Sequence, residues 1–116
     1  DSFDYTVCDN ASPANCTTST VNVSVGATPD SQNDMADTTE DTPVIVAIYT
    51  NDSNIPTDGY LVTTNPTNGT VTIDNGGTPD DPSDDIVTYT PDADFNGADS
   101  FDYTVCDNAS PANCTT

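Results

Sequence analysis

Short runs of alternating apolar and polar residues recur along the chain, each bounded by Asn, Asp, Gly or Pro. A period of two is typical of strands buried on one face, and no segment persuasively shows the helical period of 3.6 residues. About seven short strands with regularly spaced turns predict an all-β fold, an antiparallel β-sandwich. The expected strands are residues 3–7, 21–25, 44–49, 60–64, 70–73, 86–90 and 100–105.

One segment occurs twice. The letters DSFDYTVCDNASPANCTT occupy residues 1–18 and return unchanged as residues 99–116. The offset, 99 − 1 = 98 residues, is the size of one small domain, so we expect a window cut from a tandem array. The sequence TVNVSV, which should complete the sheet after the second copy, occurs only at residues 20–25.

The position of the repeat within this sequence divides the chain into two parts. We expect residues 1–27 to be the final hairpin of a preceding repeat, or donated strands, and residues 28–116 to be a sandwich repeat that lacks its last strand. The next repeat of the same chain or a neighbouring subunit would complete it. Continuation of the chain is preferred, because strand donation does not require an 18-residue overlap. Both routes give end-to-end assembly of copies of the same repeat.

The charge balance is extreme, with 20 acidic residues and no Lys, Arg or His, for a net charge of −20. Removing the duplicated Asp99, Asp102 and Asp107 leaves 20 − 3 = 17 negative charges per period. An array of such repeats is a polyanion that needs cations and avoids nucleic acid and anionic membrane surfaces. The usual general base and commonest transition-metal ligand, His, is missing. No apolar run in this segment is long enough to enter a membrane.

The four cysteines form two identical Cys-x7-Cys pairs, Cys8/Cys16 and Cys106/Cys114. Zinc ligands usually stand closer together, so disulfides are favoured over metal-bound or free thiols. Strand parity agrees: if Phe3, Tyr5 and Val7 point inward, Cys8 points outward, and inward Val21, Val23 and Val25 place Cys16 outward as well. A disulfide in each repeat implies an oxidising compartment, so we expect an extracellular or cell-surface protein.

Three stretches resemble a known family. They are DTTEDTPVIVAIYTNDSN (residues 37–54), TNGTVTI (67–73) and VTYTPDADFNGADSFDYTVCD (87–107), and they look like the bacterial cadherin-like tandem repeat of the immunoglobulin-like superfold. The resemblance covers essentially the whole period. It implies a β-sandwich module of giant surface adhesins and extracellular filaments, often calcium-binding. The cysteine pair, the insert at residues 76–85 and the lack of basic residues depart from the family pattern, and they suggest specialisation for stability and cation binding.

Four groups of side chains supply the hard oxygen atoms that Ca²⁺ prefers. By resemblance to cadherins, the groups around residues 34–41 and 92–94 would fall at the junction between domains, and residues 51–52 of the following domain would approach from the other side. The candidate calcium ligands are Asp34, Asp37, Glu40, Asp41, Asn51, Asp52, Asp92, Asp94, Asn96, Asp99 and Asp107.

Two other interpretations of these carboxylates exist. DADFNG (residues 92–97) matches the opening of an EF-hand loop, but the twelfth position is Tyr103 where that loop needs a bidentate Glu, so an EF-hand is disfavoured. The carboxylates could instead be a solvated acidic surface, as in proteins adapted to high salt. The acidic insert at residues 76–85 fits a hydrated loop and a weak ion site equally well.

The expected function is therefore a structural module of an extracellular bacterial filament or adhesin stalk, stiffened by calcium at acidic junctions and by a hairpin disulfide. The alternative is an adhesin domain that binds carbohydrate or another surface, through a face formed by Thr63, Thr64, Thr70 and Thr72. Catalysis is not expected: Asp92 and Asp94 are the place to look for glycoside hydrolysis, but the chain has no Trp and few aromatic residues to hold a sugar.

Overall fold

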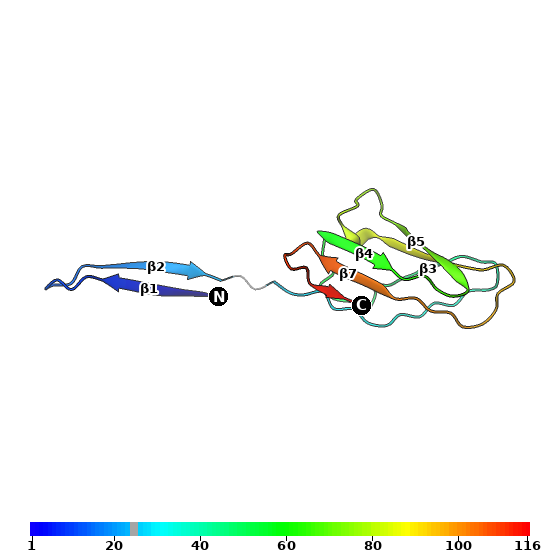
Figure 1. Ribbon diagram of the computed structural model, residues 1–116, viewed down its shortest axis with the longest axis horizontal. Coiled ribbons are helices and arrows are strands. Elements are labelled where there is room, and N and C mark those ends of the chain that lie inside the picture. Colours follow the sequence, from blue (N-terminus) through cyan, green and yellow to red (C-terminus); the bar gives the residue numbers. More distant parts are fainter. Residues whose placement is uncertain (24–25) are drawn as a thin grey trace.

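The computed structural model describes residues 1–23 and 26–116, and it consists of a two-stranded hairpin joined to a β-sandwich (Figure 1). The hairpin pairs β1 with β2, and the sandwich has two antiparallel sheets, with the orders β3-β6-β5 and β4-β7-β8. The all-β class predicted from the sequence is confirmed. The elements are β1 (Ser2–Cys8), β2 (Cys16–Asn22), β3 (Val44–Val46), β4 (Gly59–Thr63), β5 (Gly69–Asp74), the 3-10 turn η1 (Pro82–Asp84), β6 (Ile86–Pro91), β7 (Tyr103–Asp107) and β8 (Cys114–Thr115).

The core lies between the two sheets. Val87 of β6 is 1% exposed, and Val105 of β7 is fully buried. Leu61 and Tyr103 also contribute, so buried positions alternate along β4, and along β7 from Tyr103 to Val105, as a half-buried strand requires. Ile48 joins the core from the turn that follows β3. In the part of the chain that the structure describes, no helix has the length and hydropathy needed to cross a membrane.

Two expected strands are shorter than their apolar runs. The run at 44–49 is a strand only over β3, because the Ile48 amide donates to the Val46 carbonyl at 2.9 Å and the chain turns there. The last expected strand begins at Tyr103 instead of residue 100. Val25, expected to share a face with Val21 and Val23, lies outside the described residues.

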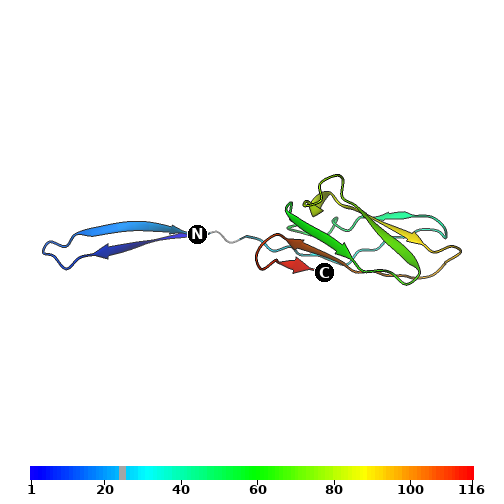
Figure 2. The same ribbon diagram turned by 45° about the horizontal axis from the view of Figure 1, so that its top comes forward.

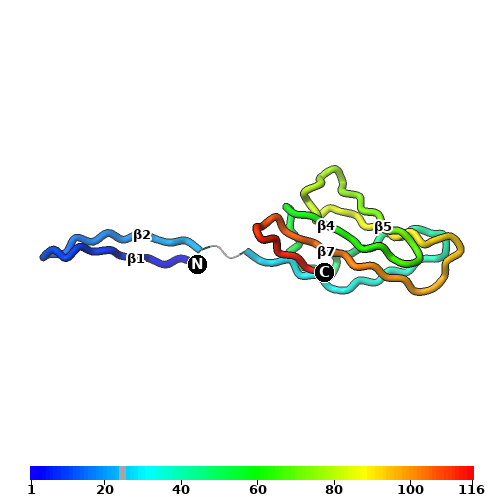
Figure 3. Tube along the Cα trace, in the orientation of Figure 1, coloured from blue at the N-terminus to red at the C-terminus, as the bar shows by residue number. Residues whose placement is uncertain are grey.

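The duplicated segment adopts one hairpin in two environments. Figures 2 and 3 show the N-terminal copy extending away from the sandwich, while the second copy lies within it. The apolar side chains of β1 are therefore exposed, with Tyr5 at 50% and Val7 at 58%, whereas their counterparts Tyr103 and Val105 are buried. Whether the first hairpin belongs to a preceding repeat stays a prediction.

Both predicted disulfides are present, Cys8–Cys16 and Cys106–Cys114. Each joins residues directly opposite one another, with Cα atoms 4.0 and 4.1 Å apart, the close spacing of a non-hydrogen-bonded pair. The predicted parity is not tested in the first hairpin, because every residue of β1 is exposed, and in the second copy Cys106 is only 2% exposed. Cys106 stands between Tyr60 of β4 and Cys114 of β8 in the sheet register, so it lies on the central strand of its sheet, whereas Cys8 belongs to a two-stranded hairpin.

Candidate functional site

The Tyr103 hydroxyl is surrounded by four oxygen atoms from two segments of the chain, residues 32–34 and residues 48–52. The carboxylate oxygens Asp52 Oδ2 and Asp34 Oδ2 lie 2.8 and 3.0 Å from it, and the carbonyl oxygens of Gln32 and Ile48 both lie at 3.1 Å. A phenol has one hydrogen to donate, so it can satisfy only one of these four acceptors fully. The result is a compact group of four acceptor oxygen atoms that share a single hydrogen-bond donor, the Tyr103 hydroxyl.

Local hydrogen bonds hold this oxygen cluster together. An isolated antiparallel bridge joins Asp30 to Ser53 and brings the segment before β3 alongside the segment after it. The Gln32 amide then donates to Asp52 Oδ1 at 2.7 Å, and Asn51 Nδ2 donates to the Asn33 carbonyl at 3.0 Å. Asn51 and Asp52, two of the predicted calcium ligands, therefore lie beside the Asp34 segment of the same repeat.

The surroundings of this cluster disfavour the ionised forms of Asp34 and Tyr103. Burial raises the pKa of Asp34, and the negative charge of Asp52 raises it further, against the hydrogen bonds from Tyr103 and Asn51, which lower it. Burial and the hydrogen bonds to the two carboxylates raise the pKa of the Tyr103 hydroxyl. A cation would relieve the repulsion between Asp34 and Asp52.

The donor set suits a hard cation. Across residues 1–23 and 26–116, no group of three or more His, Cys, Asp or Glu side chains converges into a metal site. Two carboxylates and two carbonyl oxygens are nevertheless ligand types that Ca²⁺ accepts, with water filling other positions. No local pattern in the sequence marks Tyr103, Gln32 or Ile48 as part of this cluster, because the contacts are long-range and backbone carbonyls leave no mark in residue identity.

A second acidic group lies at the other end of the sandwich. The Asp94 amide donates to Asp41 Oδ1 at 3.0 Å, and both residues adopt positive φ, 60° and 59°. The loop after β6 that carries Asp92 and Asp94 lies at the end of the sandwich away from the hairpin (Figure 1). Tyr103, at the twelfth position of the EF-hand match, belongs to the other cluster, so this loop does not have EF-hand geometry.

Two predicted ligands already have several hydrogen-bond donors. Desolvation raises the pKa of Asp99, but hydrogen bonds from the backbone amides of Asn68, Ser100 and Thr67 and from the Tyr89 hydroxyl outweigh it and hold the pKa below the ordinary value. The Asp107 carboxylate accepts from the Asn113 side chain and from two loop amides, which lowers its pKa. Asp99 therefore holds the turn at residues 67–68, and Asp107 holds the loop at residues 109–113.

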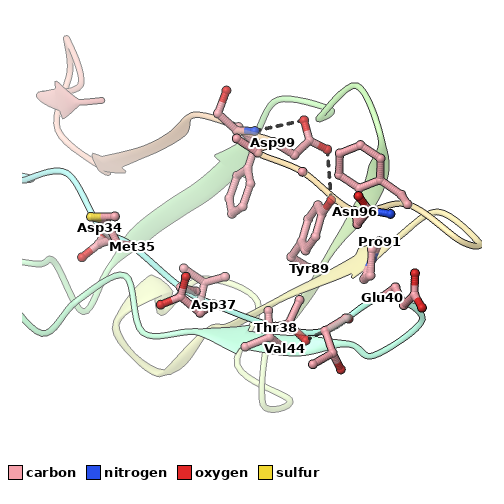
Figure 4. A pocket seen from close by; sticks show the side chains of 18 residues that line it. Asp34, Met35, Asp37, Thr38, Glu40, Val44, Tyr89, Pro91, Asn96 and Asp99 are labelled. Atoms are coloured by element: carbon pink, nitrogen blue, oxygen red, sulfur yellow. Dashed lines mark hydrogen bonds between the residues drawn. The ribbon is translucent and has the colours of Figure 1, made fainter.

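A groove of about 800 Å³ separates residues 34–40 from residues 95–101. Figure 4 shows Asp34 and Glu40 at opposite ends of it, so these two predicted junction residues do not meet within one repeat. Its lining includes apolar side chains of the sandwich, such as Val44, Tyr89 and Phe101, together with three further predicted ligands, Asp37, Asn96 and Asp99.

The threonine face expected for a ligand-binding adhesin is divided between the sheets. Thr63 ends β4, and the Thr64 hydroxyl accepts from the Asp102 amide at 2.8 Å. Thr70 and Thr72 belong to β5 in the opposite sheet. The four threonines therefore do not line one flat surface.

Comparison with known proteins gives one match. A family model described as "Bacterial Ig domain" matches residues 27–116, which include both sheets of the sandwich and all the acidic clusters. No curated protein and no solved structure matches the chain. The match agrees with the antiparallel β-sandwich and with the resemblance found in the sequence, and this chain belongs to the bacterial Ig domain family.

Proposed function

We propose that this chain is a structural repeat of an extracellular bacterial stalk or filament, in which calcium bound at the acidic ends of each repeat holds neighbouring repeats in line. Membership of the bacterial Ig domain family supports a structural repeat of a surface protein. The two disulfides support an oxidising location outside the cytoplasm. A structural role, not a catalytic one, also fits a surface that carries no basic residue.

The oxygen cluster around Tyr103 carries the calcium proposal. The residues that would hold the ion are Asp34 and Asp52, through their carboxylates, and Gln32 and Ile48, through their carbonyl oxygens. When bound, calcium would supply the positive charge that this arrangement of acceptors lacks. Binding to the folded state alone would stabilise it in proportion to the logarithm of the free calcium concentration.

The position of the second acidic group supports a role at the junction. In an array, the end that carries Asp41 and Asp94 would face the end of the next repeat that carries Asp34 and Asp52. Without cations these two acidic ends would repel each other, because no basic residue can lie between them. Calcium at this boundary would turn a self-repelling string of domains into a stiff rod.

Thermal unfolding with calcium and with EGTA, at fixed ionic strength, tests this proposal. At a calcium concentration of about 100 Kd, we expect about 2.7 kcal/mol of added stability, and no such gain when sodium replaces calcium. Asp34→Asn should abolish most of this gain. In EGTA the same variant should be at least as stable as the wild type, because the raised pKa of Asp34 means that its charge opposes folding.

The matched control is Asp80→Asn, which removes one charge from an exposed residue whose side chain makes no hydrogen bond to the described residues. It should leave the calcium response unchanged. Equal melting temperatures in calcium and EGTA would refute the calcium site and favour a solvated acidic surface. A response lost equally in both variants would mean that calcium acts on overall charge and not at the Tyr103 cluster.

A further inference from the structure

Three Asn-Gly pairs occur in the sandwich, and their asparagines are Asn68, Asn75 and Asn96. An Asn side chain that precedes Gly can react with the backbone of its own chain, because Gly has no Cβ to hinder the approach of its nitrogen to the side-chain carbonyl. Asn is a thermolabile residue in proteins for this reason. The three pairs consist of the same two residues, so a difference in their reactivity must come from what surrounds each pair.

The pair at Asn75 lies in an exposed turn that follows β5 and protrudes from the side of the sandwich (Figure 3). The Gly77 amide donates to Asn75 Oδ1 at 3.1 Å, and the Gly76 amide donates to Asp74 Oδ1 at 3.1 Å. Gly76 and Gly77 have φ angles of 59° and 89°, a backbone conformation that glycine adopts readily. The carbonyl oxygen of the Asn75 side chain and the nitrogen of the next residue therefore each have a hydrogen-bond partner.

These two hydrogen bonds have the geometry that an attack by the Gly76 nitrogen on the Asn75 side chain requires. A donor within about 3.1 Å of a carbonyl oxygen can stabilise the negative charge that develops when the carbonyl carbon is attacked. A carboxylate within about 3.2 Å of an N–H group can accept the proton as the nitrogen becomes a nucleophile. The Gly77 amide meets the first condition and the Asp74 carboxylate meets the second.

The pair at Asn68 has different surroundings. Asn68 is half-buried, its backbone amide donates to Asp99 Oδ2 at 2.8 Å, and its carbonyl accepts from the Asp92 amide at 2.9 Å. Gly69 lies against the ring of Tyr89, so closely that a Cβ at this position would stand 2.5 Å from Tyr89 Cε2. The main chain on both sides of the Asn68 carbonyl is therefore held in place, and it cannot easily close into a ring.

The pair at Asn96 provides an internal control. Asn96 and Gly97 are exposed, like Asn75 and Gly76. Within the described residues, however, no hydrogen bond reaches the Asn96 side chain or the Gly97 amide. Asn96 therefore has the accessibility of Asn75 without the two groups that would assist the reaction.

We propose that Asn75 converts spontaneously to aspartate and isoaspartate in the folded protein, faster than the other two Asn-Gly pairs, through a cyclic imide formed with Gly76. The Gly76 nitrogen bonds to Cγ of Asn75 as its proton passes to Asp74, and an electron pair of the carbonyl moves to Oδ1 beside the Gly77 amide. The carbonyl then re-forms, the Cγ–Nδ2 bond breaks, and the nitrogen leaves as ammonia with that proton. One water molecule opens the ring, and attack at Cγ gives aspartate whereas attack at the main-chain carbonyl gives isoaspartate.

The reaction changes both the charge and the backbone of the repeat. Either product adds one negative charge to a chain whose net charge is −20. Isoaspartate also places one extra carbon atom in the main chain, within the turn that the Thr78 amide closes on the Asn75 carbonyl at 2.9 Å. In an array of identical repeats, the change would occur at the same place in each unit and would accumulate with age. This inference goes beyond the proposed structural role and requires no calcium.

Mass spectrometry of the aged protein tests the inference. The 116-residue chain is incubated in EGTA at neutral pH, folded or in urea, and is then digested with pepsin at low pH, where the reaction is slow. We expect the peptide that contains Asn75 to lose its amide several-fold faster than the peptides that contain Asn68 and Asn96. In urea, where the turn is lost, the three rates should become similar. Isoaspartate at position 75 should be detectable by enzymatic methylation.

A pair of variants tests the part played by Asp74. Asp74→Asn keeps an acceptor beside the Gly76 amide but cannot take up its proton, so it should slow the loss of the Asn75 amide several-fold. The matched variant Asp80→Asn removes one charge from the same loop, from an exposed side chain that makes no hydrogen bond to the described residues, and should react at the wild-type rate.

Three results would overturn the inference. One is a folded protein in which Asn75 reacts no faster than Asn96. Another is an equally strong preference for Asn75 in urea, because the local sequence and not the fold would then cause it. The third is an Asp74→Asn protein that reacts as fast as the wild type or faster, which would show that the hydrogen bond from Gly76 only restrains its nitrogen.

Discussion

Tyr103 combines two tasks in one side chain. Its ring is part of the core, and only 8% of the residue is exposed, while its hydroxyl lies at the boundary where Asp34 and Asp52 meet. The core task was evident from the alternating pattern of the strand. The role of the hydroxyl depends on contacts with Asp52 and Ile48, which are separated from Tyr103 by 51 and 55 positions in the sequence. No local pattern reveals such contacts.

Removal of the Tyr103 hydroxyl should destabilise the folded sandwich. We expect Tyr103→Phe to lower the free energy of unfolding in EGTA by about 1–3 kcal/mol, because the surrounding acceptors lose their shared donor. Urea unfolding measures the loss. Tyr60→Phe is the control, since Tyr60 is 46% exposed and its hydroxyl has no hydrogen bond to the described residues. A Tyr103→Phe protein as stable as the control would show that the hydroxyl contributes nothing.

Asp99 should set part of the response to acid. Its hydrogen bonds lower the folded-state pKa, so its contribution to stability is complete above the ordinary aspartate value of about 3.9 and is lost as the pH falls through the lower folded value. We expect Asp99→Asn to lower the melting temperature at pH 7 and to flatten its decline below pH 4. Asp92→Asn, whose carboxylate has no hydrogen bond to the described residues, should reproduce the wild-type curve, and a similar flattening there would contradict the assignment.

At the scale of the elements, β4 offers a direct test of the sandwich. Leu61 is 8% exposed and its neighbour Val62 is 50% exposed. Leu61→Ala should cost about 2–5 kcal/mol of unfolding free energy, the usual loss for a buried Leu. Val62→Ala should cost far less. Equal losses in chemical denaturation would mean that the two faces of β4 are not buried differently.

The two disulfides should differ in their effect on the sandwich. Cys106→Ala with Cys114→Ala opens a bridge with a sequence separation of 8 within the sandwich. The chain-entropy model predicts a loss of about 2.5 kcal/mol. Cys8→Ala with Cys16→Ala should leave the melting of the sandwich unchanged in dilute protein, because that hairpin lies outside it (Figure 1). An equal loss in both double variants would show that the hairpin is part of the cooperative unit.

The strands were largely predictable from the sequence, and so were the carboxylates Asp34 and Asp52 of the oxygen cluster, whereas Tyr103 and the carbonyl oxygens of Gln32 and Ile48 were not. The alternation of Leu61 with its neighbours and the Cys-x7-Cys spacing each depend on local chemistry, and both led to correct elements. The failure at Phe101 is instructive, because the same letters form a strand around Phe3. What differs is the partner strand, which supplies Val21 in one case and nothing in the other. Pairing is a property of neighbours, not of the sequence segment alone.

The whole molecule is both elongated and strongly charged. Its radius of gyration is 23.6 Å, against about 13 Å for a compact domain of this length, and its extents are 88 × 26 × 20 Å. With a net charge of −20 and no cationic side chain, repulsion acts between its parts at low salt. The range of this repulsion falls from about 30 Å at 0.01 M salt to about 8 Å at 0.15 M.

Stability should therefore respond to simple salts. We expect the melting temperature to rise as NaCl increases from 0.01 to 0.15 M, by the same amount with KCl, and to level off above that range. Calorimetry in EGTA measures this screening without a specific ion. A melting temperature independent of salt would show that the charges are too well separated to matter.

The position of each disulfide also determines how an array would behave under tension. A pulling force would pass across the Cys106–Cys114 bridge and bypass the loop between them, even after the rest of the repeat had unravelled. Eight residue steps could otherwise extend to about 29 Å, but the bridge keeps the two Cα atoms 4.1 Å apart. Each repeat would thus have a contour length about 25 Å shorter than its residue count allows, and this difference would appear directly in force spectroscopy before and after reduction.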